Sequence, residues 1–299
     1  MNNNILILTD SLASSVQDLG RKGYRSFGVP IAGTMDKFSA ILANKLLNNE
    51  EGLAVMEMTL NGPKMMFEDK TFIVLTGADL SPSINDQPIH MNTVYPVQTS
   101  DVLSFGKRMS GVRCYLGVKG GFQTEFVMNS YSFYAGITKK PLIGKGDRIP
   151  IAECEENLQI SGAKIKVKKS HFNAKKLEAT KGPEFHLLSK KDRETLFDTE
   201  FELVANDRMA YQLTPEVEPL KTKEIITSVT IPGTVQMTPS GKLIIMMRDC
   251  PTTGGYPRIL QLTDMAINQL AQKRQGDRFK LDLESSFEFL GRLVSRFRD

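Results

Sequence analysis

Short apolar runs separated by turn-forming residues are the feature that most restricts how this chain can fold. In the first half, the runs cover residues 5–9, 54–60, 64–67, 72–76, 94–97, 102–105 and 113–118. In the second half, they cover residues 185–188, 200–204, 225–229, 234–237, 243–247 and 278–282. Many short strands at close spacing are typical of β-barrels and β-sandwiches. The sequence therefore predicts a mainly β protein.

A few helices are expected between these strands. Residues 36–47 place Phe38, Ile41, Leu42 and Leu46 on one face, and Asp36 stands near the start, where a carboxylate suits the helix dipole. Helical spacing of apolar residues also marks residues 258–273, and residues 285–297 form a plausible closing helix.

A lysine-rich segment divides the chain. Residues 164–183 hold seven lysines and few apolar residues, at positions 164, 166, 168, 169, 175, 176 and 181. Phe172 is the one phenylalanine among these lysines and no arginine accompanies them, so a solvated linker explains them better than a nucleic-acid surface. The sequence thus predicts an N-terminal domain over residues 1–163, a basic linker over 164–183 and a C-terminal domain over 184–299. The phrases Gly28-Val29-Pro30 and Gly255-Tyr256-Pro257, each followed by a helical pattern, suggest that the domains are duplicated units.

Length, charge and cysteine content set further bounds. The 299 residues suffice for one large core or two ordinary ones, and the net charge of +4 is small. No apolar run approaches the ~20 residues that a membrane-spanning helix needs, and the first residues lack the features of a secretory signal. Cys114, Cys154 and Cys250 are far apart and odd in number, so we expect no disulfide and a cytoplasmic protein.

Several well-known chemical motifs are missing from the sequence. It contains no Gly-x-x-x-x-Gly-Lys-Ser/Thr loop for nucleotide phosphates, no cysteine or histidine cluster for a metal and no Gly-x-Ser-x-Gly turn for a nucleophilic serine. Without a cysteine or histidine cluster, we expect no metal site. The sequence also lacks an Ala-Met-Lys-Met-like stretch for the attachment of biotin, so we expect no self-attached biotin.

Two glycine-rich loops carry most of the remaining polar chemistry, at residues 17–21 and 249–257. Glycines allow a backbone to approach a ligand closely, and we expect the two loops to line one shared cleft. The predicted acid, base or orienting residues are Asp18, Glu57 and Asp249. The predicted substrate-binding residues are Gln17, Arg21, Thr59, Asp79, Arg208, Tyr211, Gln236, Thr252, Thr253, Gly254, Gly255 and Tyr256. The alternative, open for each of them, is an internal brace between loops.

Glu57 stands out among these residues because it interrupts an apolar strand. Glu57 and Thr59 share one face of the expected strand, whereas Met56 and Met58 point to the other. A carboxylate in that position is either exposed or paired with an arginine, and Arg21 is a candidate partner.

Ordered phrases of the sequence resemble a known family. They are Val-Gln-Asp-Leu-Gly-Arg at 16–21, Gly-Val-Pro at 28–30, Thr-Gly-Ala-Asp at 76–79, Gly-Thr-Val-Gln at 233–236 and Thr-Thr-Gly-Gly-Tyr-Pro at 252–257. The chain resembles the KipA, or allophanate hydrolase subunit 2, family, which is also described as biotin-dependent carboxyltransferase-like and includes the C subunit of 5-oxoprolinase. This sequence departs from the family at Tyr131 and Gln212, two positions at which family members commonly carry arginines.

The resemblance implies two linked cyclophilin-like β-barrel domains and a role within an ATP-dependent 5-oxoprolinase-type complex that opens 5-oxoproline to L-glutamate. It implies a KipI-type partner (the B subunit of 5-oxoprolinase) and a LamB/YcsF-type partner (the A subunit), with ATP bound by this chain or by the complex, and no nucleic-acid or membrane partner. Two alternatives stay open. One is a regulatory protein that binds a KipI-type kinase inhibitor, and the other is a carboxyltransferase component for a urea-like substrate with a separate biotin carrier.

Overall fold

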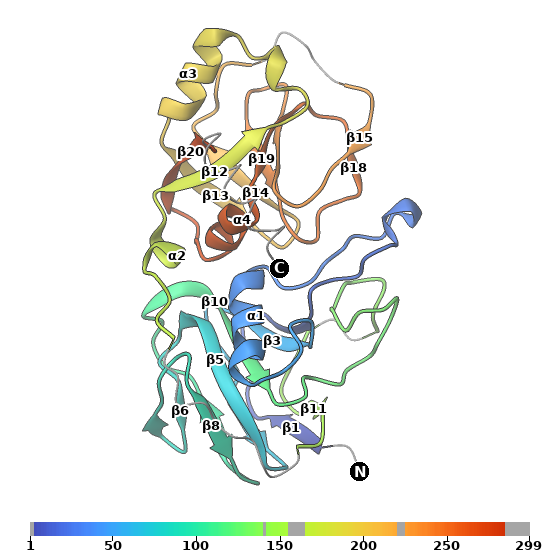
Figure 1. The fold of residues 1–299 in the computed structure, drawn as a ribbon, viewed down its shortest axis with the longest axis vertical. Coiled ribbons are helices and arrows are strands. Elements are labelled where there is room, and N and C mark those ends of the chain that lie inside the picture. The colour runs from blue at the N-terminus through green and yellow to red at the C-terminus, as the bar shows by residue number, and fades with distance from the viewer. Residues whose placement is uncertain (1–2, 140–141, 155–164, 220–224, 285–299) are drawn as a thin grey trace, which may run out of the picture. The chain divides into compact units, whose positions relative to one another are not determined.

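The computed structural model describes residues 3–139, 142–154, 165–219 and 225–284 of the chain (Figure 1). The chain divides into two compact units. Unit 1 comprises Met1–Asn173 and Ala271–Lys273, and unit 2 comprises Ala174–Leu270 and Arg274–Asp299. The division after Asn173 falls inside the segment that the sequence marks as basic.

Unit 1 contains two antiparallel sheets. The six-stranded sheet has the order β11 (Arg148–Ile151), β1 (Asn3–Ile7), β4 (Met65–Phe67), β9 (Val102–Ser104), β6 (Ser83–Ile84) and β7 (Gln87–Pro88). The five-stranded sheet has the order β2 (Ser14–Gln17), β3 (Val55–Thr59), β10 (Ser110–Val118), β5 (Thr71–Asp79) and β8 (Val94–Val97). The helical elements are η1 (Arg25–Phe27), α1 (Lys37–Leu46) and α2 (Ser170–Asn173).

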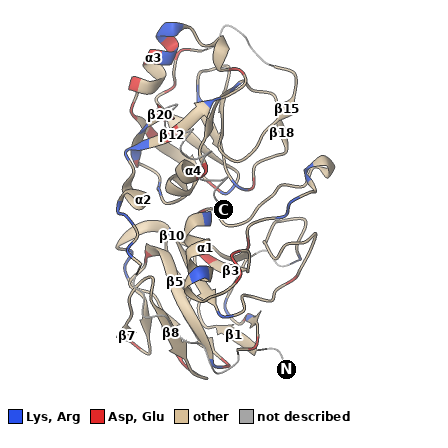
Figure 2. Ribbon diagram, viewed as in Figure 1, with Lys and Arg blue, Asp and Glu red and all other residues tan. Residues whose placement is uncertain are grey.

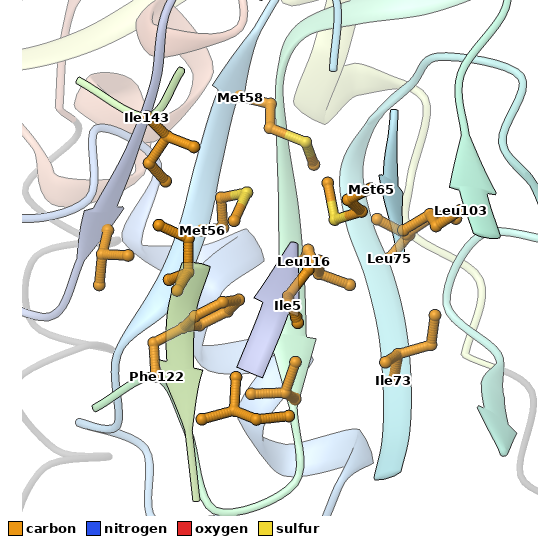
Figure 3. Packing of buried hydrophobic residues seen from close by; sticks show 14 of the residues in the cluster. Ile5, Met56, Met58, Met65, Ile73, Leu75, Leu103, Leu116, Phe122 and Ile143 are labelled. Atoms are coloured by element: carbon orange, nitrogen blue, oxygen red, sulfur yellow. The ribbon is translucent and has the colours of Figure 1, made fainter. Parts of the chain in front are cut away.

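The main core of unit 1 is built from side chains of both sheets. Ile5 and Leu103 of the six-stranded sheet pack in one buried cluster with Met56 and Leu116 of the five-stranded sheet (Figure 3). Successive residues of a strand point to opposite faces, so Val55 enters a second cluster instead, in which α1 covers the other face of the five-stranded sheet.

Unit 2 is a closed barrel of seven strands. Their order is β12 (Lys176–Lys181), β19 (Arg258–Leu262), β16 (Thr234–Met237), β17 (Leu243–Met246), β14 (Ala210–Thr214), β13 (Phe201–Asn206) and β20 (Arg278–Leu283). Strands β12 and β20 run parallel and close the barrel, which leaves the ring without an unpaired edge. The remaining elements are the strand pair β15 (Ser228–Val229) and β18 (Thr253–Gly254), the 3₁₀ turn η2 (Phe185–Leu187), α3 (Lys190–Asp198) and α4 (Asp264–Ala271).

The prediction of a mainly β chain with a few helices is confirmed. The helix expected at 36–47 is α1, and the Asp36 side chain caps it by accepting from the backbone N–H of Ser39. The closing helix expected at 285–297 lies outside the described residues.

Three local predictions are wrong. The segment predicted as a basic linker contains β12, in which Leu177 and Ala179 are fully buried between polar or charged neighbours. That alternation has the period of a strand, but the lysines around α2 and at the start of β12 (Figure 2) obscured it in the sequence. Residues 185–188 form the turn η2 rather than a strand. Residues 258–273 begin with barrel strand β19 and become helical only at Asp264, because the barrel buries Ile259 and Leu260 on both faces of the strand.

None of the three cysteines, all of which lie in the described part of the chain, forms a disulfide, and Cys114 and Cys250 are buried. No helix in the described part of the chain has both the length and the apolar character that crossing a bilayer demands.

Candidate functional site

A cavity of about 480 Å³ opens in unit 1 beside β2 and β11. Its size falls within the roughly 300–1,000 Å³ that is usual for small-molecule pockets. The lining residues are Ser15, Val16, Gln123, Thr124, Glu125, Tyr131, Phe133, Thr138, Lys139, Leu142, Ile143, Arg148, Ile149 and Pro150. Six of them are apolar and eight carry hydroxyl, amide or charged groups, so the cavity suits a small polar molecule with an apolar part.

The Asp18 carboxylate fixes one wall of this cavity. Asp18 is buried, and Oδ1 accepts from the hydroxyls of Ser130 (2.7 Å) and Ser132 (2.6 Å) and from the backbone N–H of Gly20 (2.7 Å). Oδ2 accepts from the backbone N–H of Tyr131 at 2.7 Å. Because Tyr131 lines the cavity, Asp18 determines the shape of the wall without lining it.

Gln17 and Arg21 support the same wall from behind. The Gln17 amide nitrogen donates to the Ser15 hydroxyl oxygen (3.0 Å) and to the carbonyl of Phe133 (3.4 Å). The fully buried guanidinium of Arg21 donates from Nη2 to the carbonyl of Ser132 at 2.6 Å. Three predicted site residues (Gln17, Asp18 and Arg21) therefore converge on one segment, although none of them lines the cavity itself.

Among the groups that line the cavity are the oriented Ser15 hydroxyl, two cations and the carboxylate of Glu125. Ser15 is 6% exposed, and its oxygen accepts from Gln17, so its hydrogen can be donated to a ligand. Lys139 and Arg148 bring positive charge, and Arg148 also pairs with Glu68 at 2.9 Å. A hydroxyl donor beside cationic groups is suited to binding carboxylate or carbonyl oxygens.

Glu57 belongs to a second, enclosed constellation. Its Oε2 accepts from the backbone N–H of Met35 (2.7 Å) and from the Tyr115 hydroxyl (2.8 Å), and its Oε1 lies 3.9 Å from Nε of Arg113. The alternation predicted for this strand is therefore confirmed, and the arginine found against Glu57 is Arg113, which the prediction did not name. Burial, and then the nearby carboxylates of Glu57 and Asp36, raise the pKa of Tyr115 well above its ordinary value.

Asp36 extends this constellation to distant parts of the chain. Its Oδ2 accepts from His171 Nε2 (2.7 Å), Gln272 Nε2 (2.8 Å) and the Ser39 hydroxyl (2.7 Å). Complete burial acts to raise the pKa of Asp36, but the hydrogen bond and charge of His171, with the bonds from Gln272 and Ser39, outweigh burial and hold that pKa below its ordinary value.

The hydrogen bonds around Asp36 could not be predicted from the sequence. His171 and Gln272 lie 135 and 236 residues from Asp36, so no local pattern linked them. The carboxylates of this network are enclosed and saturated with donors, so the network acts as an internal brace. Within the described residues, no group of three His, Cys, Asp or Glu side chains could hold a metal ion.

In unit 2, two of the predicted residues pair with each other. Arg208 donates from Nε and Nη2 to the two carboxylate oxygens of Asp249, at 2.8 and 2.9 Å. A second fork joins Arg258 to Glu184, and this hydrogen bonding lowers the pKa of Glu184. Each of these guanidinium groups therefore already faces a carboxylate.

The late glycine loop contains strand β18 and turns closely around Gln236. The Gln236 amide donates to the carbonyl of Tyr256 at 3.1 Å, and a Cβ on Gly254 would lie only 2.7 Å from the Gln236 nitrogen. Thr252 and Thr253 belong to the same loop, where Thr253 pairs with Val229. A side chain at Gly254 would therefore displace the Gln236 amide, whereas no such contact lies near Gly255.

The other predicted residues lie elsewhere. Tyr211 is fully buried in the barrel, and Thr59 lies opposite Arg113 in the sheet of unit 1. Asp79 lines a second pocket of about 310 Å³ in unit 1 with Asn92 and accepts from the backbone N–H of Ser81 at 2.8 Å. The expectation that residues 17–21 and 249–257 line one cleft stays a prediction, since the two loops belong to different units.

The fold and the ordered loops define a class of protein. Residues 27–283 match the family described as the carboxyltransferase domain, subdomain A and B. The chain belongs to this family, in agreement with the resemblance carried by its motifs.

Particular relatives span nearly the whole chain. The C subunit of the Haemophilus influenzae 5-oxoprolinase is 30% identical over 285 residues, which cover 93% of this chain and 91% of that protein. The C subunit of the Escherichia coli 5-oxoprolinase is 29% identical over 273 residues, covering 89% of this chain and 86% of that protein. The chain is therefore homologous to the C subunit of 5-oxoprolinase.

The fold also matches part of a much larger enzyme. The crystal structure of the K. lactis urea amidolyase superposes with a TM-score of 0.84 at 26% identity and covers 95% of this chain. This chain spans only 19% of that protein.

Proposed function

We propose that this chain is the C subunit of a 5-oxoprolinase-type complex that opens 5-oxoproline to L-glutamate with consumption of ATP. The observation that carries the proposal is the 30% identity over 93% of this chain and 91% of the H. influenzae protein. The name of that relative marks it as one component of an assembly. We propose a KipI-type B subunit and a LamB/YcsF-type A subunit as the companions of this chain.

The chemistry of the substrate explains why ATP and several subunits are needed. The amide carbon of 5-oxoproline is a poor electrophile, and ATP would phosphorylate the amide oxygen, with release of ADP, so that water can attack the carbon. The ring nitrogen would then leave as the free amine, and hydrolysis of the resulting acyl phosphate would release phosphate and L-glutamate. The sequence contains no glycine-rich phosphate loop of the P-loop type, so we assign ATP to the assembly and assign to this chain the recognition of the lactam acid.

Within this chain, the cavity of unit 1 is the proposed recognition site. Its support is the combination of Lys139 and Arg148, which suit the carboxylate of 5-oxoproline, with the Ser15 hydroxyl, which suits a carbonyl oxygen. The apolar lining would contact the methylene groups of the ring. Asp18 and Arg21 would act as positioning residues, because they hold the wall and not the ligand.

The test is turnover by the assembled complex. The chain is purified with its cognate companions, and glutamate formed from 5-oxoproline and ATP is measured. Replacing Lys139 or Arg148 with Ala should raise KM for 5-oxoproline about 10- to 100-fold, the usual effect of losing a hydrogen bond to a charged group. The control is Arg278→Ala, which removes an exposed cation paired with Glu202 in unit 2 and should leave KM unchanged.

The outcomes separate the activity from the site. An assembly that forms no glutamate with wild-type chain contradicts the proposed activity. An active assembly whose KM is the same for Lys139→Ala, Arg148→Ala and Arg278→Ala contradicts the proposed site and leaves the activity in place.

A second function is favoured by the family description and by the match to a urea amidolyase. The chain would then transfer a carboxyl group to a urea-like substrate from biotin on a separate carrier. Consumption of carboxybiotin on a purified carrier, with and without urea, would detect that activity.

A further inference from the structure

A projecting loop of unit 1 ends in an exposed aromatic ring. Residues 20–33, called the arm below, leave the sheets of unit 1 and carry η1 at their far end (Figure 1). Phe27, the last residue of η1, is 79% exposed. The turn that presents it is ordered by two hydrogen bonds, from the N–H of Phe27 to the carbonyl of Tyr24 and from the N–H of Gly28 to the carbonyl of Arg25.

The base of the arm is rigid. The N–H of Arg21 donates to the carbonyl of Ile31 (2.7 Å), and the N–H of Thr34 donates to the carbonyl of Asp18 (2.9 Å). Arg21 is fully buried at this base. A rigid base with an apolar tip lowers the entropy that is lost when the tip is immobilised by a partner.

A second exposed apolar turn lies beside the arm. Phe126 is 57% and Met128 is 38% exposed, and Met128 and Asn129 adopt φ values of +51° and +58°. Residues 127 and 130 exchange two backbone hydrogen bonds, which hold the turn in this conformation.

Contacts between side chains join the arm, this turn and the cavity into one surface, called the docking face below. Asn129 donates from Nδ2 to the Tyr24 hydroxyl at 3.2 Å. The ring of Phe126 lies 4.8 Å from the ring of Tyr131, which lines the cavity. Exposed apolar groups therefore continue from the arm to the mouth of the cavity.

We propose that the docking face binds the KipI-type companion of the assembly, with Phe27 and Phe126 as the anchoring side chains. Aromatic anchors that fill apolar pockets dominate the binding energy of protein interfaces. Lys22 is exposed on the arm and Arg25 belongs to η1 with Phe27, so the arm carries positive charge near its aromatic ring, and the complementary surface has apolar pockets bordered by carboxylates. A companion bound there would cover the mouth of the cavity. The identity of the companion rests on the proposed function.

The test measures binding to the purified KipI-type protein that accompanies this chain. Phe27→Ser should raise Kd at least about 30-fold, as for a typical hot spot, and Phe27→Ser with Phe126→Ser should raise it further. The control is Met109→Ser, because Met109 is 65% exposed in unit 1 but precedes β10 and lies outside the docking face. The melting temperatures of the three variants, followed by circular dichroism, should match that of the wild type, since the side chains removed are exposed.

The results decide as follows. Weaker binding by the two Phe variants with normal binding by Met109→Ser supports the docking face. Equal binding by all four proteins overturns it, and so does self-association of the wild type that Phe27→Ser abolishes, because the occupant is then a second copy. Glutamate formation is measured separately: an assembly that binds normally but forms no glutamate contradicts the proposed function and leaves the binding result in support of the docking face.

Discussion

Replacement of Asp36 with Ala should destabilise unit 1 far more than loss of an ordinary helix cap. The cap of α1 alone contributes about 1 kcal/mol. The change also leaves three buried donors without their acceptor, on His171, Gln272 and Ser39. Removing one partner from a buried charged pair costs about 3–5 kcal/mol, and we expect Asp36→Ala to lower the free energy of unfolding of unit 1 by that amount.

The matched control is Ser189→Ala in unit 2. Ser189 caps α3 through a capping box with Asp192, but Ser189 is exposed and Asp192 only half-buried, so the loss should be about 1 kcal/mol. The chain has no tryptophan, and α1 and α3 lie in different compact units, so amide hydrogen exchange measured at α1 and α3 is the suitable assay. The variants should differ by about 2–4 kcal/mol, each at its own helix.

The reasoning is refuted if α1 in Asp36→Ala loses no more protection than α3 in Ser189→Ala. That result would mean that the carboxylate contributes only its cap, and that the long-range hydrogen bonds to His171 and Gln272 add nothing to stability.

Three further predictions follow from burial and backbone geometry. Because the pKa of Asp36 is lowered in the folded protein, its contribution to the free energy of unfolding is complete above the ordinary carboxyl pKa of about 3.9 and is lost as pH falls through the folded value. The difference in stability between the wild type and Asp36→Asn, measured by urea unfolding, should therefore shrink below about pH 4. Gly33→Ala should cost more stability than Gly23→Ala in thermal melts: both have φ near +90°, but a Cβ at Gly33 would lie 2.8 Å from the Gly20 nitrogen whereas that at Gly23 meets open space, and equal losses would contradict the close approach. A thiol reagent at pH 8 should modify half-buried Cys154 in the folded chain but Cys114 only after unfolding. The reason is that burial, and then the charge of Asp79, raise the pKa of the Cys114 thiol. Rapid reaction of Cys114 in the folded chain would contradict this prediction, because it would show that the site of Cys114 opens.

Local patterns were reliable where a single element explains them. The cap and apolar face of α1 could be predicted because Asp36 and the helix are adjacent in the sequence. The alternation through Met56, Glu57 and Met58 also predicted correctly which side chains leave the core, since neighbouring residues of a strand point to opposite faces. The strand β12 was missed because its charged residues resemble a solvated segment, and only closure of the barrel buries Leu177.

The candidate site was predictable in part. The sequence pointed to Gln17, Asp18 and Arg21, and the structure brings all three to the wall of one cavity. It did not point to Lys139 or Arg148, which line that cavity, because lysines and arginines are common in exposed turns and carry no spacing that marks a site.

The sequence by itself determined the mainly β class, the first helix and the ordered phrases that identify the family. The tertiary structure decided which groups meet: His171 with Asp36, and Tyr131 with the Asp18 carboxylate. The physical reason is range. Alternation, caps and turns arise between neighbours in the chain, whereas cavities and buried polar networks arise between residues that only the packing of sheets and loops brings together.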